Sequence, residues 1–249
     1  MKKIVLITLI LTLLTPLFAI SLSDGPELLR KIDKNTNFEG VDLSALMTFI
    51  SEDPTDGIEK SKVLQFRSDD DDKFLLLIQE PTTQQGQGYL MIDDNLWFYD
   101  PQSRKFSHTS MKEQFNDSDA NNSDFNESSL SEDYNVVAIN EEKLGKFDVY
   151  KVEIEANNNE VTYPKQILFV TRGSLLVLKS EDYSASNRLL RTSYYPSYTQ
   201  AGSSFIPNRM IFIDNLIEGK KTTITVTDIS VKDLPDSIFT KSYVERVNN

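Results

Sequence analysis

From about residue 58 onward, apolar and polar positions alternate with the period of two that β-strands require. The segment 147–155 shows this most clearly. Tyr150, Val152 and Ile154 share one face, and charged residues occupy the other. Such a pattern predicts a strand with one face in the core and the other in water.

The segment 88–101 predicts a β-hairpin. Aromatic and branched residues crowd both of its arms, and Asp93-Asp94-Asn95 supplies the residues of a tight turn. Pro101 cannot donate to a sheet ladder, so the second arm should end there. The only tryptophan of the chain, Trp97, lies in that arm.

Similar segments recur along the chain, separated by turns of two to six residues. About ten strands are expected. Two hairpins cover 88–101 and 166–179, the second with its turn at 172–174, and the clearest other strands cover 62–67, 74–78, 147–155, 187–195 (ending at Pro196) and 222–231. Short turns predict antiparallel neighbours. A sheet of this size has to curl or close. The stretch 38–52 fits both strand and helix, and a strand is favoured at its end.

Helical signals concentrate near the N-terminus. Ser23 or Asp24 can cap a helix, Pro26 suits its first turn, and Leu28, Leu29 and Ile32 form one apolar stripe at its side. The helix should end by residues 35–37. The predicted fold is mainly β: a strongly curved antiparallel sheet or half-barrel, with this helix on its concave side.

The first 21 residues have the layout of a secretory signal peptide. Two lysines precede an apolar run from Ile4 to Leu14, and small residues follow at Ala19-Ile20-Ser21. We therefore expect cleavage near Ala19–Ser21, export to the periplasm, and one mature domain over 22–249. An uncleaved N-terminal anchor is the alternative. No later segment is apolar for long enough to span a bilayer.

Composition excludes several functions. Loss of Lys2 and Lys3 would leave 24 basic residues against 38 acidic ones, a net charge of −14. Such a domain repels nucleic acid and anionic membranes. The chain has no cysteine, which excludes thiol catalysis and thiolate metal sites. We expect no cofactor, no bound metal and no nucleic-acid partner, and a monomer.

Three features invite a chemical role and fit plainer explanations better. Asp69–Asp72 is interpreted as a solvated turn, because consecutive turn residues point in different directions and cannot enclose Ca²⁺. The acidic stretch 113–133 resembles a calcium loop but has Asn122 and Ser128 at its decisive positions. It is interpreted as a mobile surface loop, with Phe125 and Leu130 able to tuck under the sheet. His108, the only histidine, has no catalytic partners nearby.

Three segments resemble the periplasmic outer-membrane lipoprotein carriers of the LolA-like family. Leu96–Pro101 looks like the family's LWFY(N/D)P segment. Asn122–Phe125, followed by Leu130, is similar to its G-S-D-F…L segment. Val231–Thr240 looks like its closing strand and exit. The resemblance implies an unclosed barrel whose hollow is covered by helices and a lid segment.

The resemblance also implies a function. A carrier of lipid or lipoprotein acyl chains needs a hydrophobic enclosure, because each exposed CH₂ costs about 0.8 kcal/mol. Inner- and outer-membrane transfer partners would follow. The arginine that locks the lid in the family has no matched motif here, and Arg67 is a candidate by location only. The candidate lining residues are Leu64, Phe66, Leu76, Trp97, Tyr150, Val152, Ile154, Ile224 and Val226.

Two other functions stay open at this point. The same fold resembles sensor proteins that bind a membrane-anchored anti-sigma factor, and a solid core without a cavity would favour that role. A hydrolase with paired carboxylates is the third possibility. Its acids would have to converge, whereas here they fall in loops and on solvent faces, and the chain has no nucleotide loop or nucleophile elbow.

Overall fold

The structure is a computed structural model that describes residues 20–247. The expected signal peptide therefore lies almost wholly outside the described residues. Within 20–247, no helix is both long and apolar enough to cross a bilayer. The same residues contain no group of three or more acidic or histidine side chains placed to hold a metal ion.

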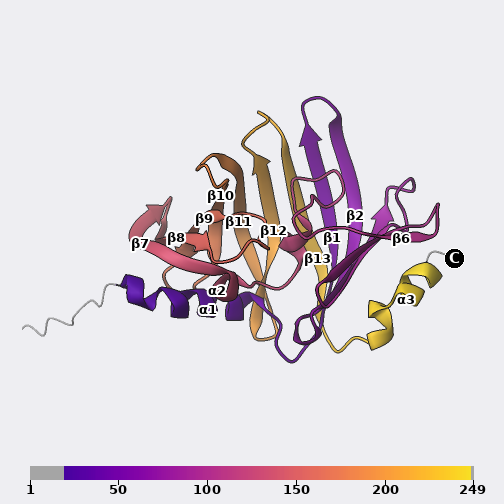
Figure 1. Cartoon of the computed structure of the whole chain (residues 1–249), viewed down its shortest axis with the longest axis horizontal. Coiled ribbons are helices and arrows are strands. Elements are labelled where there is room, and N and C mark those ends of the chain that lie inside the picture. Colours follow the sequence, from indigo (N-terminus) through magenta and orange to yellow (C-terminus); the bar gives the residue numbers. More distant parts are fainter. Residues whose placement is uncertain (1–19, 248–249) are drawn as a thin grey trace, which may run out of the picture.

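Thirteen strands of the described chain form one antiparallel sheet that does not close into a barrel (Figure 1). This confirms the predicted fold class. The strands are β1 Leu43–Asp53, β2 Gly57–Ser68, β3 Lys73–Glu80, β4 Gly88–Ile92, β5 Asn95–Asp100, β6 Lys105–His108, β7 Tyr134–Leu144, β8 Phe147–Ala156, β9 Lys165–Thr171, β10 Val177–Tyr183, β11 Leu189–Ala201, β12 Ser204–Asp214 and β13 Lys221–Val231.

The strand order explains how a single segment comes to cover the sheet. Strands β1 to β6 run outward to one edge, and β13 back to β7 run outward to the other, with β1 and β13 paired in the middle. Met47 of β1 faces Val226 of β13 in this central pair. The two edge strands, β6 and β7, are consecutive in sequence. Residues 109–133, here called the crossing segment, therefore have to pass from one edge of the sheet to the other.

The N-terminal helix α1 (Gly25–Thr36) confirms the sequence prediction. Pro26 lies in its first turn, and Leu28, Leu29 and Ile32 are buried. They pack with side chains of β8 and β9, including Val152 and Leu168. Figure 1 shows α1 beside β7 and β8, together with the short helix α2 (Leu130–Asp133) at the end of the crossing segment.

The sheet has two covered faces, as β3 shows. Phe74, Leu76 and Ile78 belong to the core beneath the crossing segment, whereas Leu75 and Leu77 belong to a separate core. Because successive side chains of a strand point to opposite sides, these two cores lie on opposite faces of the sheet. We call them the helix face, under α1 and the crossing segment, and the C-terminal face.

The C-terminal face is covered by the end of the chain. Helix η4 (Asp236–Phe239) and helix α3 (Lys241–Arg246) place Phe239 and Val244 against Leu75 and Leu90. Figure 1 shows α3 at the β6 end of the sheet, opposite α1. The C-terminal residues 236–246 are therefore part of the packed structure.

The crossing segment is held to the sheet by aromatic packing. The rings of Phe115 and Phe125 lie 5.2 Å apart, and both contact Phe49 of β1, at 5.3 and 5.8 Å between ring centroids. Phe115, Ala120 and Phe125 are buried. The interpretation of 113–133 as a surface loop is wrong for these residues, although Phe125 does tuck under the sheet as the alternative allowed.

Two further predictions need correction. Strand β11 does not end at Pro196 but continues to Ala201, because the pairing register shifts on both sides of Ser197 and spares the missing N–H of proline. Asp69 does not belong to a solvated turn. It is buried, and its carboxylate accepts a hydrogen bond from the Phe38 backbone N–H at 2.7 Å.

Candidate functional site

A cavity of about 420 Å³ lies on the helix face, between the sheet and the cover formed by α1 and the crossing segment. It opens to solvent. Its apolar and aromatic wall comes from α1 and the residues after it, the crossing segment, the start of β7, the loop between β8 and β9, and β9 to β12. It consists of Ile32, Phe38, Met111, Leu130, Tyr134, Val161, Tyr163, Leu168, Val177, Tyr195, Tyr198, Phe205, Ile206 and Pro207. Its volume falls within the roughly 300–1,000 Å³ of small-molecule sites.

The structure places the nine predicted lining residues elsewhere, and none of them lines this cavity. Three lie on the C-terminal face. Leu64 and Phe66 pack beneath the C-terminal segment, and Trp97 stacks on His108 under the Lys241 ammonium, which is 3.1 Å from the ring centroid. The residues that pack within the cores of the helix face are Leu76, Tyr150, Val152, Ile154, Ile224 and Val226.

Leu64 and Phe66 lie on the C-terminal face, and not in the cavity as predicted, for a physical reason. On β2 the polar residues Gln65 and Arg67 face the helix face, where they donate hydrogen bonds to the crossing segment. The apolar residues between them therefore point to the opposite face, where the C-terminal segment buries them. Alternation alone does not show which of two covered faces an apolar residue meets.

Arg67 does line the cavity, and it joins the two halves of the cover. Its guanidinium donates to the backbone oxygen of Asn126 in the crossing segment and to that of Thr36 at the end of α1, both at 3.1 Å. It is also paired with Asp69. Because Asp69 in turn holds the Phe38 N–H, one ion pair fixes the end of α1 and the crossing segment to strand β2.

Two polar side chains at the end of α1 strengthen the same junction. Asp33 accepts hydrogen bonds from the Ser128 hydroxyl and from the N–H groups of Leu130 and Ser131, at 2.6, 3.0 and 2.8 Å. It thus serves as an N-terminal cap for α2, supplied from another helix. Asn37 exchanges two hydrogen bonds with the Ser128 backbone. The cover is therefore one connected unit.

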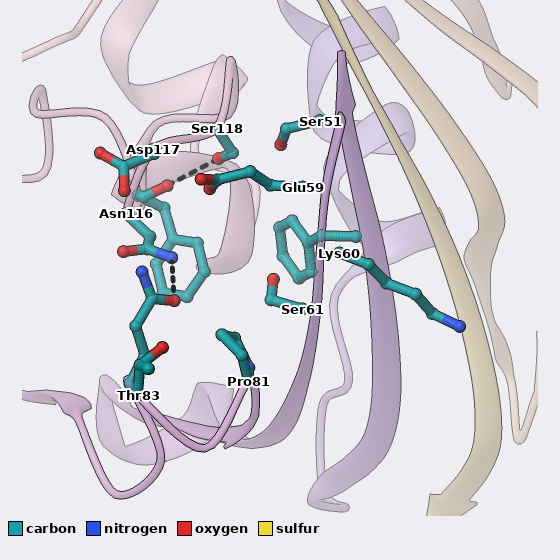
Figure 2. A pocket seen from close by; sticks show the side chains of 12 residues that line it. Ser51, Glu59, Lys60, Ser61, Pro81, Thr83, Asn116, Asp117 and Ser118 are labelled. Atoms are coloured by element: carbon teal, nitrogen blue, oxygen red, sulfur yellow. Dashed lines mark hydrogen bonds between the residues drawn. The ribbon is translucent and has the colours of Figure 1, made fainter. Parts of the chain in front are cut away.

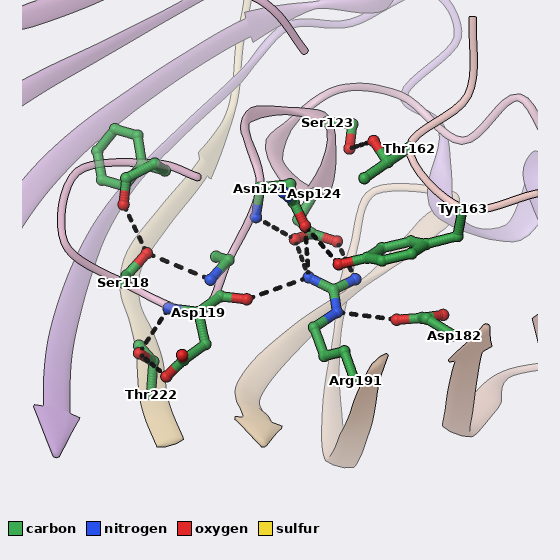
Figure 3. Close-up of polar contacts among 12 residues, drawn as sticks. Ser118, Asp119, Asn121, Ser123, Asp124, Thr162, Tyr163, Asp182, Arg191 and Thr222 are labelled. Atoms are coloured by element: carbon green, nitrogen blue, oxygen red, sulfur yellow. Dashed lines mark hydrogen bonds and ion pairs between the residues drawn. The ribbon is translucent and has the colours of Figure 1, made fainter. Parts of the chain in front are cut away.

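A second buried arginine anchors the middle of the crossing segment (Figure 3). Arg191 of β11 donates to both carboxylate oxygens of Asp124, at 2.5 and 2.9 Å, and to Asp182 of β10 at 2.8 Å. Its guanidinium also lies 4.8 Å from the ring centroid of Tyr163. Burial alone would lower the pKa of Arg191, but the two carboxylates outweigh it and hold that pKa well above its usual value.

Beside this cluster, the turn before Asp124 is attached to the sheet through Thr222 (Figure 3). The Thr222 hydroxyl accepts from the Asp119 N–H at 2.9 Å and donates to the Asp119 carboxylate at 2.8 Å. Burial raises the pKa of Asp119. The middle of the crossing segment and its α2 end thus have their own polar attachments.

A smaller pocket of about 270 Å³ lies under the turn 115–118, between β1, β2 and the loop 81–84 (Figure 2). Asn116 donates to Gln84 at 3.0 Å across its rim. The two cavities share no lining residue. Phe125, whose neighbours line the large cavity, packs on Phe49 and Phe115, which line the small one. The aromatic cluster therefore separates them.

Sequence reasoning did not identify Arg191, Asp182 and Asp33. Arg191 occurs in a predicted strand and Asp182 between two predicted strands, both among ordinary polar residues, and only the folded sheet brings Arg191 into contact with Asp182 and Asp124. The one usable signal was Asp124 itself, which lies in the NSDF segment that resembles the family motif. A buried partner for that motif was a reasonable expectation.

Glu127 of the crossing segment lines the cavity and has a shifted pKa. Burial, together with the neighbouring Asp72 and Asp69, raises its pKa from 4.5 to about 7, against the opposing effect of Arg67. The folded protein therefore binds more protons at this site than the unfolded chain does between these two values. The contribution of Glu127 to the free energy of unfolding should fall as pH rises from about 4.5 to about 7.

We expect Glu127→Gln to flatten the pH dependence of stability in that window. The free energy of unfolding, measured by urea titration at pH 5, 6, 7 and 8, should fall less steeply for this variant than for the wild type. Glu142→Gln, on the exposed side of β7, is the matched control and should keep the wild-type slope. Equal slopes for Glu127→Gln and the wild type would contradict the assignment.

Comparisons with known proteins identify the fold. A solved structure of a LolA superfamily protein from Nitrosomonas europaea is 26% identical, with a TM-score of 0.76 over 90% of this chain and 100% of that chain. A candidate outer membrane lipoprotein-sorting protein domain from Vibrio parahaemolyticus is 20% identical, with a TM-score of 0.80 over 91% of this chain and 100% of that one.

A DUF1329 family protein from Desulfovibrio piger is also 20% identical, with a TM-score of 0.78 over 90% of this chain and 98% of that chain. A search of curated proteins finds no match. A family model described as "Uncharacterized protein" matches residues 70–246, which is more than half of the chain. The chain therefore belongs to that family, and its fold is LolA-like.

Proposed function

We propose that this protein is a periplasmic carrier that binds lipid or lipoprotein acyl chains in the cavity of the helix face and delivers them toward the outer membrane. The cavity carries the proposal. Half of its lining residues are apolar or aromatic, it opens to solvent, and it lies under a cover held by aromatic packing and by two buried arginines. Moving an acyl chain through water requires such an enclosure.

Two observations support the proposal. A similar solved structure is that of a candidate outer membrane lipoprotein-sorting protein domain. The cover packs on the sheet through apolar side chains of α1 and of the crossing segment, but its two halves meet at the polar Arg67 junction, which is where we expect it to open. The protein performs no chemistry in this proposal. The signal peptide and export expected from residues 1–21 belong to it as well.

The test is native mass spectrometry of the protein purified from a bacterial periplasm, before and after organic extraction. We expect a bound acylated mass that extraction removes. Val177→Trp should fill the cavity and weaken binding of a fluorescent fatty-acyl probe about tenfold, because Val177 lies in its wall. Val137→Trp, on the exposed part of β7, is the matched control and should bind like the wild type.

A mass without ligand, together with no uptake of the probe by the wild type, would overturn the carrier proposal. A protein-interaction module of the same fold would then be the better explanation. If the probe bound but Val177→Trp bound it as tightly as the wild type, the acyl chain would lie elsewhere on the molecule.

A further inference from the structure

We propose that the cargo of this cavity is an amphiphile with one acyl chain and a positively charged polar end, such as an amine. This inference rests on the proposed function and narrows it to a class of ligand. Three features of the cavity carry it: its volume, the state of its arginines, and the state of its carboxylates.

The volume limits the cargo to about one chain. A methylene needs roughly the volume of a water molecule in the liquid, about 30 Å³. The cavity of about 420 Å³ therefore accommodates about 14 heavy atoms, the size of a single medium-length acyl chain. A lipid with two or three chains would require displacement of α1 or the crossing segment, both of which are anchored by the buried ion pairs described above.

Neither arginine of the cavity is available for an anionic head. Every guanidinium nitrogen of Arg67 already donates to a protein oxygen: those of Asp69, Asn126 and Thr36. The same is true of Arg191, whose nitrogens donate mainly to Asp124 and Asp182. An incoming carboxylate or phosphate would have to replace these partners and lie beside the acids it displaced.

The carboxylates of the cavity, unlike its arginines, mostly lack a partner of opposite charge. Four acidic residues line it, against two arginines and no lysine. Asp124 is paired with Arg191, but Glu127, Asp133 and Glu160 form no ion pair within the described part of the chain. The Asp133 carboxylate accepts only from neutral donors, the Ser129 hydroxyl and the Asn158 amide. A cationic head would supply a positive charge to these carboxylates of the cavity lining.

The experiment compares three ligands of equal chain length: dodecyltrimethylammonium, dodecyl maltoside and laurate. Each competes with the fluorescent acyl probe at pH 8, above the pKa of Glu127 near 7, and below its micelle concentration. We expect the cation to bind at least about tenfold tighter than laurate, a difference of about 1.4 kcal/mol, with the maltoside between them. Didodecyldimethylammonium, with two chains, should bind more weakly than the single-chain cation.

The variant Glu127→Gln should reduce the preference for the cation over dodecyl maltoside several-fold, and continued binding of dodecyl maltoside would show that the variant is folded. Glu142→Gln is the control for a remote charge. If laurate bound as tightly as the cation, or the two-chain cation bound tighter, this inference would fail while the carrier proposal stood. If none of the ligands bound, the carrier proposal itself would fail.

Discussion

Replacement of Arg191 by methionine should destabilise the folded protein by about 3–5 kcal/mol, the usual cost of removing one partner from a buried ion pair. Asp182 is fully buried, and Arg191 is its only cationic partner among the described residues. Without the guanidinium, the Asp182 carboxylate either stays charged in a poorly polar environment or takes up a proton. Both alternatives cost free energy.

The measurement is thermal and urea unfolding of Arg191→Met. For a domain of 150–250 residues, each kcal/mol lowers Tm by about 2–4 °C, so a loss of at least about 6 °C is expected. Arg172→Met is the matched control. Its ion pair with Glu141 is exposed to solvent, and removal of such a pair costs only about 0–1 kcal/mol.

A double variant separates charge from shape. Asp182→Asn in the Arg191→Met background removes the uncompensated acid and should recover part of the lost stability. The side-chain amide introduced by this change could still accept the hydrogen bond that Gln166 now donates to Asp182 at 2.8 Å. If Arg191→Met were no less stable than Arg172→Met, the cluster would contribute no more than a surface pair does.

The sequence was sufficient for the fold because its signals are local. Period-two alternation in 147–155 and turn residues at Asp93–Asn95 are properties of neighbouring residues, and both became strands and a turn where expected. Antiparallel order followed from the short connections. Only the pairing of β1 with β13 depends on residues far apart in sequence, and nothing in the pattern specified it.

The site was much less predictable, since it depends on which residues meet across the sheet. Apolar residues such as Val152 and Ile154 were expected to line a hollow, but α1 covers them. The hollow lies instead where the cover is polar, near Arg67 and Arg191. Alternation identifies a buried face but does not distinguish packed core from a cavity, because both require the same apolar side chains.

Replacement of Arg67 by methionine should loosen the cover before it unfolds the sheet. Arg67 and Asp69 have side chains that are 10% and 3% exposed, so loss of the guanidinium leaves a buried carboxylate, at a cost of about 3 kcal/mol. It also removes the only side chain shown to donate to both Thr36 and Asn126. The cost should therefore fall on the junction of α1 with the crossing segment.

Amide hydrogen exchange can locate this effect. The N–H groups of Ser128, Leu130 and Ser131 donate across the junction, and in Arg67→Met they should exchange much faster while the central strands β1 and β13 keep their protection. Lys62→Met is the matched control. Lys62 lies on β2, like Arg67, and its loss breaks only an exposed ion pair with Glu80 of β3, so these amides should stay protected.

In Arg67→Lys the junction amides should exchange at rates between those of Arg67→Met and the wild type. An ammonium keeps the charge but lacks the forked donors that reach two backbone oxygens and a carboxylate together. If the cover is also the entrance for an acyl chain, the fluorescent probe should associate faster with Arg67→Met than with Lys62→Met. Exchange of the junction amides only together with β1 and β13 would show that the cover opens by global unfolding alone. In that case Arg67 would be a purely structural residue.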